Sequence, residues 1–229
     1  MKTALAKLKI RVALKRLFGR RVALSDIALS LLRPDDTLFE AGAHTGWDTL
    51  NLAGLTQGTV HAFEPVPTLF RELEMRCRNA ANVSCYCLAL GTENGTVDMY
   101  LSSGSSDASS SLLKPKKHFQ TNPDVFFEEK TSVPVMKLDS WAEQEDVKKV
   151  DFMWLDLQGM ELAMLKHGRS VLKGVRLIYT EVSELELYEN QASYAELRTW
   201  LQGEGFRLYK EELLWGHTGN VLFVRDKNA

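Results

Sequence analysis

The stretch that most constrains the fold is an apolar run that ends in an acid, followed by a glycine-containing turn and the start of a helix. The run covers residues 37–40, the turn holds Gly42 and Gly46, and residues 47–52 begin the helix. This order is typical of a nucleotide or cofactor pocket in an α/β sheet. Because Glu40 would repel a phosphate, the turn suits a cationic or amine-bearing ligand. An ordinary strand-to-helix turn without a ligand is the alternative.

Length and composition place the chain among globular α/β proteins. With 229 residues, 45% of them hydrophobic, it is long enough to bury the core of one domain. The net charge of −2 gives no electrostatic reason to expect a nucleic-acid partner. No apolar run approaches the ~20 residues of a membrane span, and the basic N-terminus lacks the apolar core of a signal peptide. We therefore expect a cytoplasmic protein.

Residues 1–33 are predicted to form a basic, helical N-terminal segment ahead of a main domain that spans residues 34–229. Eight Lys or Arg residues precede the first acid of the chain, and Leu5, Leu8 and Val12 follow a helical spacing. Two interpretations stay open. The helix docks its apolar stripe on the domain, which we favour because the stripe is narrow, or it lies on an anionic membrane surface.

After the turn, strand-like and helix-like segments alternate along the chain. The predicted strands are residues 37–41, 59–63, 83–90, 150–155 and 175–182; the predicted helices are 46–56, 67–80, 159–167 and 193–203. Such alternation implies parallel strands joined by right-handed crossovers. Residues 206–209 and 220–224 then read as a terminal antiparallel pair. The fold class is therefore α/β, with a Rossmann-like sheet between two layers of helices.

The alternation of strands and helices stops after the third predicted strand. Asn94 and Gly95 predict a tight turn, so residues 97–101 should pair antiparallel with the preceding strand, residues 83–90. Residues 102–132 are rich in serine and then in lysine and phenylalanine, without clear periodicity. A loop of this length inside a domain is typically a lid, a binding loop or a disordered segment. Two interpretations stay open: the segment is a mobile flap over a bound substrate, or it is disordered.

Five short motifs occur in an order that resembles the FkbM-like family of class I S-adenosylmethionine-dependent methyltransferases. They are Glu40-Ala41-Gly42-Ala43-His44-Thr45-Gly46, Phe63-Glu64-Pro65, Ala89-Leu90-Gly91, Val135-Met136-Lys137-Leu138-Asp139-Ser140 and Leu155-Asp156-Leu157-Gln158-Gly159-Met160-Glu161. The resemblance covers about residues 35–225. It implies a seven-stranded, mostly parallel sheet with an antiparallel last strand, S-adenosylmethionine as cofactor, and methyl transfer usually to a hydroxyl oxygen.

Three positions depart from the family pattern. His44 stands where the family has Asn, Trp154 where it has Lys, and Gln158 where it has Glu. The first change affects the expected contacts with the cofactor. The other two lie near the expected acceptor site, so they affect the substrate and not the fold.

The resemblance and the chemistry of the residues together predict the cofactor site. Glu40 is expected near the methionine end of the cofactor, whose sulfonium and ammonium groups are positive. Gly42 and Gly46 are expected to let the backbone approach it. Glu64 ends the neighbouring strand, where its carboxylate can accept both ribose hydroxyls. The motifs add further expected cofactor contacts: His44, Pro65, Ala89, Leu90 and Asp156.

Three residues are candidates for catalysis. Asp156 is the first, because a carboxylate at the end of that strand can orient a hydroxyl and take up its proton. Its alternative role is to cap the helix over residues 159–167. Glu181 is the second candidate; it could share a Mg²⁺ with Asp156, although two acids do not establish a metal site. His217, in a glycine-flanked turn, is the third, and a loop histidine is more often only solvated.

The expected acceptor is a small molecule or a saccharide that offers a hydroxyl group, such as a sugar, a glycan or a secondary metabolite. A second class of function stays open. The chain could hold a nucleotide or S-adenosylmethionine without catalysing a reaction, because Trp154 and Gln158 replace the family's Lys and Glu.

Overall fold

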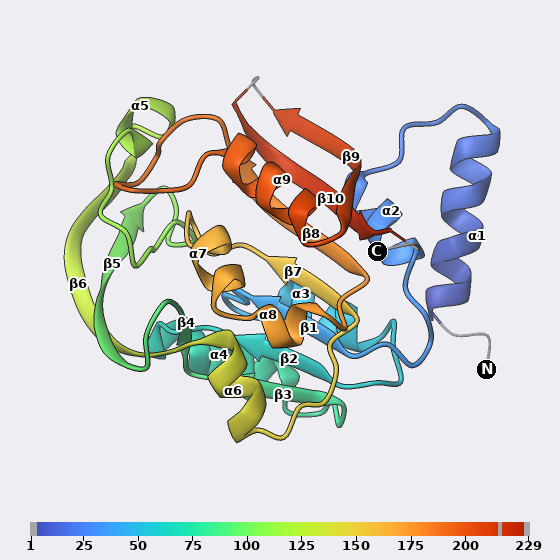
Figure 1. Ribbon diagram of the computed structural model, residues 1–229, viewed down its shortest axis with the longest axis horizontal. Helices are drawn as coiled ribbons and strands as arrows, with labels where there is room; N and C mark the ends of the chain where they lie inside the picture. Colours follow the sequence, from blue (N-terminus) through green and yellow to red (C-terminus); the bar gives the residue numbers. More distant parts are fainter. Residues whose placement is uncertain (1–3, 215–216, 227–229) are drawn as a thin grey trace.

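A seven-stranded sheet runs through the middle of the protein in the computed structural model, which describes residues 4–214 and 217–226 (Figure 1). Its strand order is β3-β2-β1-β7-β8-β10-β9. The strands are β1 (Leu38–Ala41), β2 (Val60–Phe63), β3 (Val83–Tyr86), β7 (Phe152–Leu155), β8 (Leu177–Ser183), β9 (Phe206–Leu214) and β10 (Thr218–Arg225). β10 is antiparallel to both of its neighbours, and the pairs among β3, β2, β1, β7 and β8 are parallel.

Helices cover both faces of this sheet because its central strands are apolar on both sides. Every residue of β1 and β2 is buried, as expected for strands between two helical layers. One face packs against α6 (Leu138–Gln144), α7 (Glu161–Lys166), α8 (Arg169–Leu172) and α9 (Tyr194–Gly203). The other face packs against α1 (Ala4–Leu17), α2 (Leu24–Ser30), α3 (Trp47–Ala53) and α4 (Pro67–Cys77).

The apolar stripe of the N-terminal helix is buried, as the docked interpretation predicts. Leu5, Leu8 and Val12 of α1 belong to the same core as the starts of the central strands. Arg11 and Lys15 also pair with Asp26 of α2. The segment is thus packed on the domain and does not stand apart from it. No helix within the described ranges is long and apolar enough to cross a membrane.

A second, smaller sheet corrects two expectations about the middle of the chain. It contains β4 (Ala89–Leu90), β6 (Val125–Met136) and β5 (Gly95–Gly104), in that order. The predicted strand 83–90 is therefore divided between two sheets. β5 pairs antiparallel with β6, and not with the strand before the turn.

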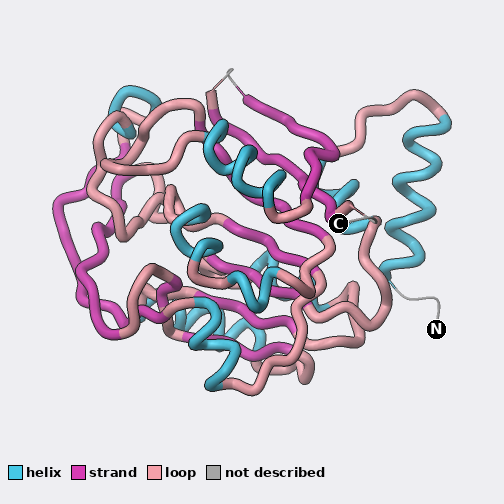
Figure 2. The backbone as a smooth tube through the Cα atoms, in the orientation of Figure 1, coloured by secondary structure: helices cyan, strands magenta, loops and turns pink. Residues whose placement is uncertain are grey.

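The predicted irregular segment, residues 102–132, is also shorter than expected. Strands reach into it from both ends, and α5 (His118–Thr121) lies within it, so the loop proper is residues 105–117 (Figure 2). The sequence does not indicate β6, because much of this strand faces solvent and lacks the alternation of apolar residues that predicts a strand. Residues 128–130, for example, are all exposed and charged. Whether the loop moves as a flap stays a prediction.

Candidate active site

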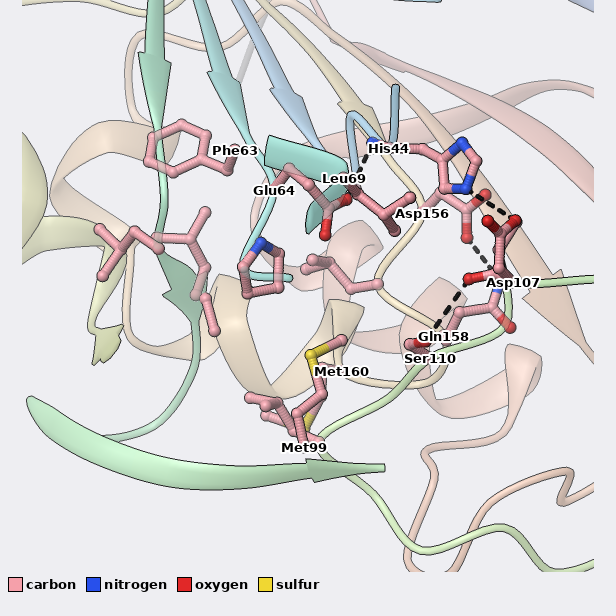
Figure 3. Close-up of a pocket in the computed structure, with 18 residues that line it drawn as sticks. His44, Phe63, Glu64, Leu69, Met99, Asp107, Ser110, Asp156, Gln158 and Met160 are labelled. Carbon is pink, nitrogen blue, oxygen red and sulfur yellow. Dashed lines mark hydrogen bonds and ion pairs between the residues drawn. The ribbon is translucent and has the colours of Figure 1, made fainter. Parts of the chain in front are cut away.

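A cavity lies at the carboxyl ends of β1, β2 and β7, where ligands bind in open α/β sheets (Figure 3). Apolar side chains line one end and carboxylates line the other. The lining residues are Gly42, His44, Phe63, Glu64, Pro65, Leu69, Leu88, Ala89, Leu90, Met99, Asp107, Ala108, Ser110, Leu112, Asp156, Leu157, Gln158 and Met160. Seven of the nine expected cofactor residues are among them; Glu40 and Gly46 are not.

The glycines of the first turn make room for protein atoms, not for a ligand. Gly42 has a φ of +86°, and a Cβ there would lie 2.0 Å from the carbonyl oxygen of Asp156. Gly46 has a φ of +83°, and its Cβ would lie 2.7 Å from Cδ1 of Leu73. Both positions therefore need glycine for conformation and for packing. Only Gly42 reaches the cavity, where it brings the turn after β1 against the end of β7.

Glu64 is held rigidly with its carboxylate at the cavity. Oε2 accepts the backbone N–H of His44 at 2.9 Å, and Oε1 accepts that of Val66 at 2.8 Å. The residue is only 5% exposed, and burial raises the pKa of its carboxyl despite these bonds. Each oxygen keeps a free lone pair, so the group can accept further hydrogen bonds from a ligand. This geometry fits the two hydroxyls of a ribose.

Glu40 does not face the cavity, which corrects the expectation that it meets the methionine end of the cofactor. Its side chain is 1% exposed and turns towards α3, where Thr49 Oγ1 donates to its Oε2 at 2.5 Å. Burial raises the pKa of Glu40 to about 8, so the carboxyl is largely neutral at pH 7. Through Thr49 its side chain joins the end of β1 to α3.

The end of the cavity beside Glu64 is apolar. Leu69 of α4, Leu88, Ala89 and Leu90 at β4, and Met99 of β5 form its walls. Such a slot fits a flat, weakly polar ring such as adenine. Pro65, Ala89 and Leu90 line the cavity, and their contact with the cofactor stays a prediction. β5 supplies a wall that the motifs did not reveal.

The opposite end of the cavity is built around the side chain of Gln158. Its Nε2 donates to Asp156 Oδ1 at 2.6 Å and to Glu181 Oε2 at 2.8 Å. Its Oε1 lies 2.8 Å from the hydroxyl of Tyr188. One amide thus joins the carboxyl groups that end β7 and β8. Asp156 and Gln158 line the cavity, whereas Glu181 lies behind them.

The protonation of this carboxyl pair follows from burial and mutual repulsion. Burial raises the pKa of Asp156, and burial together with the charge of Asp156 raises that of Glu181 to about 8. Ionisation of both carboxyl groups at once is therefore disfavoured, and their pKa values depend on each other.

The structure does not support the alternative in which Asp156 caps the following helix. α7 begins at Glu161, with Met160 at the capping position, and no side chain accepts a capping hydrogen bond. Instead the carboxylate of Glu161 binds the backbone N–H groups of Leu157 and Gly159, at 2.8 and 3.1 Å. Burial raises the pKa of Glu161 to about 7. The turn is thus shaped by Glu161, which leaves Asp156 available at the cavity.

The loop after β5 closes one side of the cavity. Asp107 Oδ1 lies 2.9 Å from Nε2 of His44, and Ser110 also lines the cavity. The hydroxyl of Tyr188 lies 2.8 Å from the carbonyl oxygen of Ser109, so the same tyrosine contacts both the loop and Gln158. No motif indicated Asp107, Ser110 or Tyr188, because each comes from a segment outside the motifs.

The third catalytic candidate lies outside the cavity lining. His217 is exposed in the turn before β10, and its Nδ1 lies 3.8 Å from Oε2 of Glu184. The geometry brings Asp156 and Glu181 together and leaves His217 apart from them. Within the described ranges, no group of three or more His, Cys, Asp or Glu side chains could hold a metal ion.

Solved structures share this architecture. Fibrillarin from Methanococcus jannaschii aligns with a TM-score of 0.53 and 14% identity, over 95% of this chain and 75% of that one. Fibrillarin from Aeropyrum pernix, solved with natively bound S-adenosyl-L-methionine, aligns with a TM-score of 0.50 and 15% identity, over 93% and 74%. At these identities the likeness concerns the fold alone. That fold is the class I S-adenosylmethionine-dependent methyltransferase fold.

Sequence comparison then narrows the class to a family. The family model for the methyltransferase FkbM domain matches residues 40–208. The 2-O-methyltransferase NoeI from Sinorhizobium fredii is 31% identical over 170 residues, which cover 71% of this chain and 70% of that protein. The chain belongs to the FkbM methyltransferase family. It is an S-adenosylmethionine-dependent methyltransferase, so the interpretation as a non-catalytic binding module is not favoured.

Proposed function

We propose that this methyltransferase transfers the methyl group to a hydroxyl oxygen of a saccharide or a related small molecule. The observation that carries the proposal is the carboxylate of Asp156, which Gln158 holds at the end of the cavity remote from the apolar slot. A carboxylate there suits a hydroxyl acceptor, whose proton must leave. The relative named 2-O-methyltransferase supports an oxygen as the acceptor atom.

The cofactor contacts divide along the cavity. Glu64 accepts hydrogen bonds from the ribose hydroxyls, and the apolar slot around Leu69, Leu90 and Met99 takes the adenine. The carboxylates of Asp107 and Asp156 lie at the other end of the cavity, where they balance the positive charges of the methionine part. Gly42 and His44 contribute the turn between these ends, while Glu40 and Gly46 act by holding that turn.

The residues around Asp156 prepare the acceptor. Bound S-adenosylmethionine supplies an electrophilic methyl group and its own sulfur leaving group. The protein therefore mainly supplies proximity, orientation and a site for one proton. Asp156 orients the acceptor hydroxyl and takes its proton as the oxygen forms its new bond to carbon. Glu181 stays protonated behind Asp156, and Gln158 keeps the two carboxyl groups in register.

The test is a binding measurement followed by an acceptor screen. Calorimetry should show binding of S-adenosylmethionine, and incubation with a panel of saccharides should release S-adenosylhomocysteine. The same saccharides with their hydroxyls blocked are the matched control and should give no turnover. Turnover on amines or thiols but on no hydroxyl would contradict the proposal. The cytoplasmic location expected from the sequence stays a prediction.

A further inference from the structure

The N-terminal helix is apolar on two opposite faces, and only one of them packs on the domain. Leu5, Leu8 and Val12 are buried. On the other side Ile10, Leu14, Leu17 and Phe18 are exposed, with 57%, 48%, 76% and 71% of their surfaces accessible. At about 100° per residue, Ile10, Leu14 and Leu17 share an arc of roughly 60° that points away from the buried face. Three large apolar side chains on one outward face, with Phe18 exposed directly after the helix, are more than scattered exposure explains.

Basic residues flank this outward face. Within the bounds of α1 there are five basic residues and no acidic one: Lys7, Lys9, Arg11, Lys15 and Arg16. Arg11 and Lys15 are partly neutralised by Asp26, and Lys9 donates to the carbonyl oxygen of Leu32. In the described part of the chain, Lys7, Arg16 and Arg20 make no ion pair. An apolar stripe with uncompensated positive charge along it is the pattern of a helix that lies in the surface of an anionic bilayer.

The charge pattern favours a lipid surface over a second copy of the chain. Pairing of two such helices would bring basic residues against basic residues, which is unfavourable when no acid on α1 compensates them. A fluid bilayer also needs no matching groove. Its acyl region can take Ile10, Leu14, Leu17 and Phe18 while its anionic headgroups meet Arg16 and Arg20.

We infer that the outward face of α1, defined by Ile10, Leu14 and Leu17, docks the enzyme on an anionic lipid membrane together with Phe18, which directly follows the helix. The helix lies far from the small sheet and the loop that border the cavity (Figure 1). A membrane bound at α1 therefore leaves the cavity open to water, so the acceptor reaches the site from solution. The inference does not depend on which acceptor is methylated.

Flotation of the full-length protein with vesicles tests the inference. Phosphatidylcholine vesicles that contain phosphatidylglycerol should carry the wild type upward at low salt, and pure phosphatidylcholine vesicles should not. The triple variant Ile10→Ser/Leu14→Ser/Leu17→Ser keeps every charge and should bind the anionic vesicles more weakly by on the order of tenfold. The matched control, Met75→Ser/Phe119→Ser, removes two exposed apolar side chains elsewhere and should float like the wild type.

Two further measurements make the result decisive. S-adenosylmethionine affinity should be equal in the wild type and both variants, which shows that each is folded. High salt should release the wild type, because screening weakens the attraction to the headgroups. The inference is overturned if the wild type does not float with anionic vesicles, or if the triple variant floats equally well. A second copy of the chain would be the partner instead if three results hold. The wild type is a dimer in gel filtration, the triple variant is a monomer, and the wild type does not bind vesicles.

Discussion

The two ends of the cavity are built in different ways. The end that we propose for the ribose and adenine depends on neighbouring pieces of backbone: the turn after β1 and the end of β2 fix Glu64 through two main-chain N–H groups. The acceptor end depends on side chains from distant segments, with Gln158 and Tyr188 joining β7, β8 and the loop after β5. Contacts made by the backbone persist when side chains are substituted, so that end of the cavity keeps its ligand. Contacts made by side chains change with substitution, so the other end can change its substrate.

The largest effect is expected at the acceptor end. Asp156→Asn preserves the shape of the side chain and its bond from Gln158, but an amide cannot take up a proton. Turnover should fall by ~10²–10⁴-fold. The affinity for S-adenosylmethionine should change far less, because the ribose and adenine contacts remain. Steady-state kinetics on an identified acceptor, with Asp98→Asn on the exposed part of β5 as the matched control, measures this difference. Full activity of Asp156→Asn would remove its catalytic role and leave Glu181 as the leading candidate.

A smaller effect should follow from weakening the position of the Gln158 side chain, whose amide joins Asp156 and Glu181. The hydroxyl of Tyr188 lies within hydrogen-bond distance of Gln158 and of the loop, so Tyr188→Phe releases both. We expect a fall in kcat of about tenfold, since one hydrogen bond of this kind is lost.

The same variant has a second readout that a purely structural role would not change. The acid limb of the pH–rate profile should shift, because the carboxyl pair loses its fixed geometry. The exposed Tyr209→Phe is the control and should leave both kcat and the profile unchanged. Identical profiles for Tyr188→Phe and the wild type would show that Tyr188 acts only on the loop.

A third effect concerns stability and not turnover, and it arises at the buried carboxyl of Glu40. Burial raises the pKa of Glu40 from 4.5 to about 8, so the folded state binds this proton more tightly than the unfolded chain does. The stabilisation is complete below pH 4.5 and is lost as the pH rises through about 8. Glu40→Gln removes this contribution, whose slope is at most about 1.4 kcal/mol per pH unit. The introduced glutamine side chain can still accept the hydrogen bond from Thr49.

Denaturant unfolding at several pH values measures that slope. The free energy of unfolding of the wild type should decrease from pH 5 to pH 8 more steeply than that of Glu40→Gln. Glu72→Gln, on the exposed side of α4, is the matched control and should keep the wild-type slope. Equal slopes for the wild type and Glu40→Gln would mean that Glu40 is ionised in the folded protein.

The sequence predicted the elements whose signal is local. The strand–turn–helix at Gly42, the acid at Glu64 and the alternation of strands and helices gave the main sheet and the cofactor end. It could not predict that the Gly42 position makes room for Asp156, or that Glu40 turns towards Thr49, because both depend on packing between separate elements. Residues such as Asp107 and Tyr188 reach the site only through the path of the loop after β5.

The most direct test of the account is a calorimetric titration of S-adenosylmethionine into the wild type, Glu64→Ala and Asp156→Asn. We proposed that Glu64 accepts hydrogen bonds from the ribose and that Asp156 orients the hydroxyl of the acceptor. Glu64→Ala should therefore weaken binding by at least about tenfold, since hydrogen bonds to a carboxylate are lost. Asp156→Asn should weaken binding less than Glu64→Ala does, because it removes one charge near the methionine part and keeps the ribose and adenine contacts. Wild-type affinity in Glu64→Ala, with a large loss in Asp156→Asn, would contradict the division of the cavity on which the account rests.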